Sequence, residues 1–157
     1  MSLHIVQEYL KPYAKDSQII ELSQSSATVE LAAQALGIQE ERIAKTLSLW
    51  VKDHAVVIVC AGDCRIDNHA FKDVFKTKPK MLKAEEVERY TNHTIGGVCP
   101  FGIPKTTDIY FDESLKRFES VYPACGSANS AIELTIDELE NIVPFLSWID
   151  VCKGWKE

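Results

Sequence analysis

One apolar run limits the fold more than any other feature of this sequence. Residues 55–61, Ala-Val-Val-Ile-Val-Cys-Ala, are apolar without interruption and rich in β-branched side chains. Such a run predicts a β-strand that is buried on both faces. A second predicted strand, 46–51, lies just before it, separated by a short turn at Asp53-His54. Connections this short favour antiparallel pairing.

The remaining hydrophobic periodicity predicts an irregular alternation of helices and strands. Helical spacing and capping residues predict helices over 3–14, 29–36, 67–75, 84–90 and 135–143. Further strands are expected over 109–111, 120–122 and 131–134, with short helical turns over 40–44 and 112–118. Ser25 or Ser26 is expected to cap the second helix and Asp67 the third, in which Phe71 and Val74 face inward. Because several strands follow one another closely, we expect an α+β fold with a mixed, largely antiparallel sheet.

Composition and charge narrow the class of protein. The 157 residues are 46% hydrophobic and 25% charged, which suits one globular domain over 1–157 and excludes disorder as the main state. The net charge of −6 disfavours a protein that wraps nucleic acid along its length. Lysines do gather between Lys72 and Lys83. Such charge runs are commonly solvated surface, so we favour that interpretation over a contact with nucleic acid. No apolar stretch is long enough for a membrane span and the N-terminus does not resemble a signal peptide, so a cytoplasmic protein is expected.

Cysteine usage argues against a disulfide framework. The five cysteines, at positions 60, 64, 99, 125 and 152, are odd in number. Cys60-x-x-x-Cys64 followed by His69 is a weak metal-site pattern, because no second pair follows at zinc-site spacing. Cys60 also ends the apolar run, where a thiol behaves as a small hydrophobe. We therefore expect no metal and no cofactor, and we expect all four histidines to be solvated.

Two loops and one lysine carry the strongest chemical signals. The glycine loop, residues 94–104, holds three glycines and two prolines, so it can present backbone N–H groups rigidly to a carbonyl oxygen or an oxyanion. A tight turn between elements explains it equally well. The small-residue loop, 124–130, offers hydroxyl and amide side chains for a pocket wall, although ordinary turn chemistry is commoner. Lys45 directly precedes a predicted strand, where position alone favours a surface side chain.

These residues belong to a set of motifs that resembles the YbaK / prolyl-tRNA-synthetase-associated editing-domain family. Residues 27–37 resemble its first helix, and Arg42-Ile43-Ala44-Lys45-Thr46-Leu47 resembles its I-x-K-[ST]-L segment. Residues 59–67 resemble its strand and G-D-x-R-[VI]-D turn. Gly96-Gly97-Val98-Cys99-Pro100-Phe101-Gly102 resembles its G-G-V-x-P-x-G loop, and 112–115 and 126–130 complete the set. Each motif alone is weak, but five in order at matching spacing are specific.

The resemblance implies hydrolysis of the ester bond in mischarged aminoacyl-tRNA, by an α+β domain with a barrel-like sheet, flanking helices and no metal. Lys45 would contact the terminal nucleotide, and backbone donors of the glycine loop would hold the ester carbonyl. The catalytic residues that it implies are Lys45, Gly96, Gly97 and Val98. The substrate-binding residues that it implies are Thr46, Cys99, Pro100, Phe101, Gly102, Gly126, Ser127, Asn129 and Ser130. The expected partner is the aminoacyl-tRNA acceptor end, and an aminoacyl-tRNA synthetase stays open as a further partner. Binding to a membrane or to DNA is not expected.

Two other functions stay open from the sequence. The same pocket could hold a tRNA end or a synthetase without hydrolysis, as a binding module. A thiol-dependent redox or metal protein could use Cys60, Cys64 and Cys99. Cys99 alone suggests a thiol nucleophile, but the sequence identifies no histidine partner for it. The leading hypothesis is a free-standing, trans-editing aminoacyl-tRNA deacylase.

Overall fold

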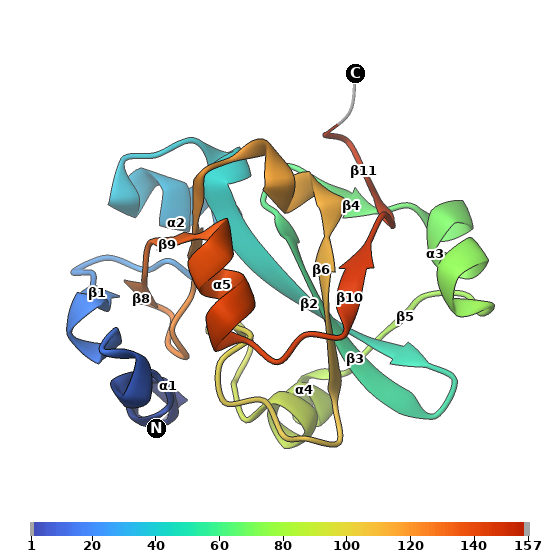
Figure 1. The fold of residues 1–157 in the computed structure, drawn as a ribbon, viewed down its shortest axis with the longest axis horizontal. Helices are drawn as coiled ribbons and strands as arrows, with labels where there is room; N and C mark the ends of the chain where they lie inside the picture. Colours follow the sequence, from blue (N-terminus) through green and yellow to red (C-terminus); the bar gives the residue numbers. More distant parts are fainter. Residues whose placement is uncertain (1, 156–157) are drawn as a thin grey trace.

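The computed structural model describes residues 2–155, in which five α-helices surround a curled sheet (Figure 1). The helices are α1 (Ser2–Leu10), α2 (Val29–Leu36), α3 (Asn68–Phe75), α4 (Ala84–Thr91) and α5 (Ile136–Ile142). The strands are β1 (Ile20–Glu21), β2 (Ile43–Val51), β3 (His54–Ala61), β4 (Arg65–Ile66), β5 (Lys80–Met81), β6 (Asp108–Asp112), β7 (Ser120–Pro123), β8 (Ser130–Ala131), β9 (Leu134–Thr135), β10 (Ser147–Ile149) and β11 (Cys152–Lys153). Short 3-10 turns occupy Lys11–Tyr13, Asp16–Gln18, Glu40–Arg42 and Glu113–Arg117.

The central sheet is mixed. Its strand order is β10-β6-β3-β2-β7-β9, and β5 also pairs with β2. The longest ladder joins β2 and β3 antiparallel around the short turn, from Ala44 opposite Ala61 to Val51 opposite His54. Parallel ladders join β3 to β6, β6 to β10 and β2 to β7. The predicted α+β fold class is therefore confirmed.

Strand β3 lies at the centre of the core. Every residue from Ala55 to Ala61 is at most 3% exposed. β2 and β6 cover its two edges, and apolar side chains of α1, α3 and α5 belong to the same buried cluster. Each fully buried Val or Ile contributes roughly 1.5–3 kcal/mol, so this strand alone accounts for a large part of the hydrophobic stabilisation. The uninterrupted apolar run is thus explained by burial on both faces.

The five helices lie where the sequence predicts them, but several boundaries differ. α1 ends at Leu10 and not at residue 14, because the chain tightens into the 3-10 turn over Lys11–Tyr13 that contains Pro12. β2 begins at Ile43, so the predicted helical turn over 40–44 ends at Arg42, and Lys45 lies within the strand and not before it.

α2 begins after Thr28, whose side chain accepts a hydrogen bond from the backbone three residues on, and not after Ser25 or Ser26. Thr28 holds this position because it directly precedes the helix in an extended conformation. Asp67 caps α3 as predicted. Val74 of α3 is 43% exposed and does not face inward, because α3 packs at the outside of the sheet with only one face covered (Figure 1).

The last third of the chain departs most from the sequence expectation. The predicted strand 131–134 is two short strands, because β8 pairs with β1 whereas β9 pairs with β7. β10 and β11 are not predicted at all, and they pair with β6 and β4. In residues 2–155 no helix combines the length and the apolar character that a membrane span requires.

Candidate active site

A mostly apolar cavity of about 300 Å³ opens along one edge of β2. β7 pairs with β2 at Ile43 and Ala44, and β5 pairs with it at Leu49 and Trp50. Because β3 occupies the opposite edge throughout, β7 and β5 share the remaining edge and leave a gap between them. The cavity lies in this gap, beside residues 45–48. The sheet is therefore locally open, and strand backbone as well as side chains can meet a ligand.

Segments that are distant in the sequence close the other sides of the cavity. They are residues 26–29 at the start of α2, the glycine loop, and the strand residues Tyr122 and Ser130. Two apolar side chains of the lining, Ile95 and Met81, are 66% and 55% exposed. Exposed apolar residues around an apolar hollow are typical of a ligand-binding site.

Lys45 lines this cavity, and two backbone carbonyls hold its ammonium group. Nζ donates a hydrogen bond to the carbonyl oxygen of Cys64 and lies 3.5 Å from that of Gly62. Position 62 requires glycine, because a Cβ there would lie 2.1 Å from the carbonyl oxygen of Glu40. An ammonium has three N–H donors. One donor of Lys45 therefore remains for an oxygen of a substrate.

Two buried hydroxyl oxygens of cavity residues have no hydrogen-bond partner within the described part of the chain. They are Oγ of Ser26 and Oγ1 of Thr46. Leaving a buried polar atom unpaired costs about 1–3 kcal/mol, so most such atoms are satisfied in folded proteins. A bound ligand that supplies polar atoms would remove this cost. Thr46 is a predicted substrate-binding residue, whereas Ser26 was expected only as a candidate helix cap.

The predicted catalytic residues of the glycine loop divide into a lining part and a packing part. Gly96 and Val98 line the cavity, and Gly96 has φ +97°, which favours glycine. Gly97 is buried against the small-residue loop, where a Cβ would lie 2.6 Å from the carbonyl carbon of Gly126. The Gly97 N–H also donates to the carbonyl oxygen of Thr94 over 3.0 Å. Gly97 is therefore committed to loop packing, and Gly96 and Val98 are the better candidates for donors to a substrate.

The next four residues of the loop motif lie outside the cavity lining. Cys99, Pro100 and Phe101 are buried, and Gly102 packs so closely on α1 that a Cβ would lie 2.6 Å from Ile5 Cγ2. A direct contact between substrate and these residues stays a prediction. Their packing holds the glycine loop against the rest of the domain.

His93 is fully buried beside Cys99, so the expectation that it is solvated is wrong. Its Nε2 lies 2.7 Å from the carbonyl oxygen of Phe101 and 3.5 Å from Cys99 Sγ. Because a carbonyl only accepts hydrogen bonds, Nε2 carries the proton and cannot take one from the thiol. Burial also raises the pKa of Cys99 to about 12. A histidine neighbour of Cys99 thus exists, but this tautomer does not generate a thiolate nucleophile.

The small-residue loop contributes Ser130 to the cavity, and its other predicted residues hold neighbouring segments. Ser127 is hydrogen-bonded to the Ser130 hydroxyl. The Asn129 side chain donates to the carbonyl oxygen of Leu22 over 3.1 Å. Gly126 packs against α1, where a Cβ would lie 2.5 Å from the Ser2 carbonyl oxygen. The loop therefore braces the wall that carries Ser130.

Comparison with known proteins places this arrangement in a family. Residues 23–142 match the family model of the aminoacyl-tRNA editing domain. The chain belongs to the aminoacyl-tRNA editing domain family. The resemblance that the sequence motifs indicate is thereby confirmed, and the match includes every residue predicted for catalysis or substrate binding.

Relatives of this editing domain extend over nearly the whole chain. YwhH of Bacillus subtilis, an uncharacterised protein, is 47% identical over 99% of this chain and 100% of its own length. EbsC of Enterococcus faecalis, named as a candidate Cys-tRNA(Pro)/Cys-tRNA(Cys) deacylase, is 28% identical over 85% of this chain and 81% of its own. Among solved structures, a candidate trans-editing enzyme for prolyl-tRNA synthetase superposes with a TM-score of 0.86 at 27% identity, covering 98% of both chains.

Proposed function

We propose that this editing domain acts in trans and hydrolyses the ester bond of mischarged aminoacyl-tRNA. The observation that carries the proposal is the meeting of Lys45, Gly96 and Val98 at one apolar cavity that also contains two unpartnered hydroxyls. The names of EbsC and of the trans-editing structural neighbour support the same reaction class. The acidic net charge agrees with a protein that grips only the acceptor end of the tRNA.

Ester hydrolysis requires a positioned ester, an attacking oxygen and stabilisation of the oxyanion. Lys45 would bind a phosphate or ribose oxygen of the terminal nucleotide with its remaining N–H. Backbone N–H groups of Gly96 and Val98 would hold the ester carbonyl, and each well-placed donor of this kind contributes about 10²–10³ in rate. The attacking group would be a water or a ribose hydroxyl held against the carbonyl, which proximity alone accelerates strongly.

The apolar lining restricts the amino acids that fit. A cationic side chain would lose its hydration without an opposite charge beside it, because the described lining contains no acidic residue. An anionic side chain would compete with the terminal nucleotide for Lys45. We therefore expect the enzyme to act on small, uncharged aminoacyl groups, with Thr46 and Ser26 bonding to polar atoms near the ester.

A panel of mischarged tRNAs tests the function. Purified protein is incubated with tRNA carrying cysteine, alanine, serine or proline, and with charged residues such as aspartate as negative controls. We expect rapid release of at least one small amino acid by the wild type and a loss of at least about 10²-fold in Lys45→Met. Lys52→Met is the matched control, because Lys52 is exposed in the β2–β3 turn, and it should keep the wild-type rate.

One observation favours a binding module as the second candidate. In the described structure the Lys45 ammonium and the Gly97 N–H already have intramolecular partners. A binding module would retain mischarged tRNA in a filter or mobility assay without releasing amino acid from any member of the panel. That result would overturn the deacylase proposal, whereas hydrolysis that depends on Lys45 would support it.

A further inference from the structure

Three of the five cysteines form a cluster for which the deacylase proposal has no use. The sulfur atoms of Cys60, Cys64 and Cys152 all lie within 4.8 Å of one another. Each of the three residues is at most 5% exposed. The alternative of a thiol-dependent protein that the sequence left open places Cys99 with Cys60 and Cys64, but the structure brings Cys152 there instead. Cys152 was missed because it joins the cluster only through a strand pairing distant in the sequence.

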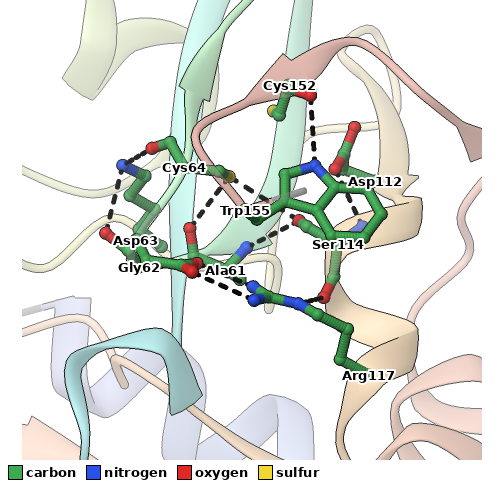
Figure 2. Close-up of polar contacts among 10 residues, drawn as sticks. Ala61, Gly62, Asp63, Cys64, Asp112, Ser114, Arg117, Cys152 and Trp155 are labelled. Carbon is green, nitrogen blue, oxygen red and sulfur yellow. Dashed lines mark hydrogen bonds and ion pairs between the residues drawn. The ribbon is translucent and has the colours of Figure 1, made fainter. Parts of the chain in front are cut away.

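The fold holds the three thiols in place from three different elements. Cys60 lies in β3, and Cys64 follows in the turn to β4, where its N–H donates to the Ala61 carbonyl oxygen over 3.2 Å. β11 pairs antiparallel with β4 and so brings Cys152 against that turn. The Trp155 indole lies next to Cys152, and its Nε1 donates to the Cys152 carbonyl oxygen over 3.1 Å (Figure 2). The site is therefore largely formed in the folded chain.

The spacing suits metal ligation better than it suits a disulfide. Tetrahedral zinc with Zn–S bonds of about 2.3 Å separates its sulfur ligands by about 3.8 Å, so these thiols need to approach by about 1 Å or less. A disulfide would draw one pair together to about 2 Å and leave the third thiol unused. A disulfide engages only two of the three thiols, whereas one metal ion can bind all three.

The charges around the cluster favour a divalent ion. Lys45 lies opposite Cys60 in the β2–β3 register, and its ammonium bonds to the Cys64 carbonyl oxygen. Asp112 is a buried carboxylate that lies near Cys152 and Ser114 (Figure 2). Its two oxygens accept backbone hydrogen bonds from Val151 and Ser114 over 2.9 Å each. Three thiolates, Asp112 and Lys45 sum to −3. A divalent ion reduces this to −1 and a monovalent ion only to −2, and residual charge is costly in a buried site.

We infer that Cys60, Cys64 and Cys152 form a buried thiolate site for one Zn²⁺ ion. Zn²⁺ binds thiolate ligands strongly, and the neighbouring Asp112 carboxylate would act as an outer electrostatic partner of the ion. The ion would tie β3, the turn before β4 and β11 together. It would thereby fix the Cys64 carbonyl that holds Lys45. This inference departs from the metal-free site that the family resemblance implies.

Metal titration of the whole chain tests the site. Protein stripped with a chelator under reducing conditions is titrated with Co²⁺ and then with Zn²⁺. We expect one Co²⁺ per chain, with sulfur-to-metal charge-transfer absorption that Zn²⁺ removes, and a melting temperature that rises with Zn²⁺ concentration. Cys152→Ser should lose the absorption. Cys125→Ser is the matched control, since Cys125 is a fully buried cysteine outside the cluster, and it should keep the absorption.

A second measurement on the wild type covers the case in which Cys152→Ser does not fold. The metal-free and the Zn²⁺-loaded protein are alkylated in mild denaturant, and the modified peptides are identified by mass spectrometry. Zn²⁺ should protect Cys60, Cys64 and Cys152 and leave Cys99 and Cys125 unprotected. The inference is wrong if Co²⁺ does not bind to the reduced protein, or if Zn²⁺ protects all five cysteines equally or none of them.

Discussion

Gly97→Ala tests whether the contact between the glycine loop and the small-residue loop shapes the site. A Cβ at position 97 would lie 2.6 Å from the Gly126 carbonyl carbon, 2.7 Å from the Ser127 nitrogen and 2.8 Å from the Gly126 oxygen. All three are backbone atoms, so the two loops must separate by roughly 1 Å. Overpacking of this kind costs about 1–3 kcal/mol. For a chain of this length that is a fall of roughly 2–12 °C in melting temperature.

The effect on the reaction is expected to exceed the effect on stability. Gly96 and Val98 flank Gly97 and line the cavity, so a displaced loop moves the backbone N–H groups that would hold the ester. Misplacing a catalytic group by about 1 Å costs about 10²-fold in rate. We therefore expect Gly97→Ala to lose about that factor in deacylation, measured with the best substrate of the panel at a temperature well below its melting point.

Gly37→Ala is the matched control for the loss of stability. Gly37 has φ +70° at the end of α2, and a Cβ there would have nothing within 4 Å. Its substitution costs only the left-handed conformation, about 1–2 kcal/mol, and does not touch the loops. Gly37→Ala should thus melt earlier than the wild type but keep its deacylation rate. If Gly97→Ala matches Gly37→Ala in both measurements, the loop contact has no part in the reaction and the reasoning is refuted.

Two further predictions concern buried polar groups. Thr46→Val removes an unpartnered hydroxyl but keeps the shape of the side chain, so the free energy of unfolding by urea should stay equal or rise. If the hydroxyl bonds to substrate, kcat/KM should fall by about tenfold. A rate equal to that of the wild type would exclude that bond. Burial lowers the pKa of His93. Below about pH 6.5 the imidazole of the unfolded chain therefore takes up a proton that the folded chain does not bind, and the free energy of unfolding should fall as the pH drops further. His93→Gln keeps a donor for the Phe101 carbonyl and should lose this part of the decline between about pH 7.5 and 5; an unchanged pH dependence would contradict the assignment.

Local signals in the sequence were sufficient for the elements around the cavity. The β2–β3 hairpin was predictable because its turn is short and β3 is apolar throughout. α2 was predictable because its apolar stripe ends at Gly37, which adopts the left-handed conformation that the cap requires. Lys45, Thr46, Gly96, Val98 and Ser130 were found by resemblance, and the structure gathers these five at one cavity.

The remaining features depend on contacts between distant residues, which local patterns do not reveal. β10 and β11 are three and two residues long, so pairing with β6 and β4 defines them more than composition does. Ser26 precedes α2 like an ordinary cap, and its place at the cavity follows only from the approach of the small-residue loop, where its N–H meets the Ala128 carbonyl. His93 gave no signal because its partner, the Phe101 carbonyl, is a backbone group that the local sequence does not mark.

The partners of Lys45 explain how one lysine can serve a reaction that develops negative charge. Both contacts of its ammonium in residues 2–155 are to backbone carbonyls, those of Cys64 and Gly62. A carboxylate in direct contact would cancel more of the field that the ammonium exerts on a phosphate or an oxyanion than these two neutral dipoles do, and the dipoles also orient the group. The carbonyls are held firmly in turn, because Gly62 packs against Glu40 with no room for a Cβ. Lys45→Arg should therefore rescue deacylation poorly, since a planar guanidinium cannot direct single N–H donors to both carbonyls and to the substrate from the same position.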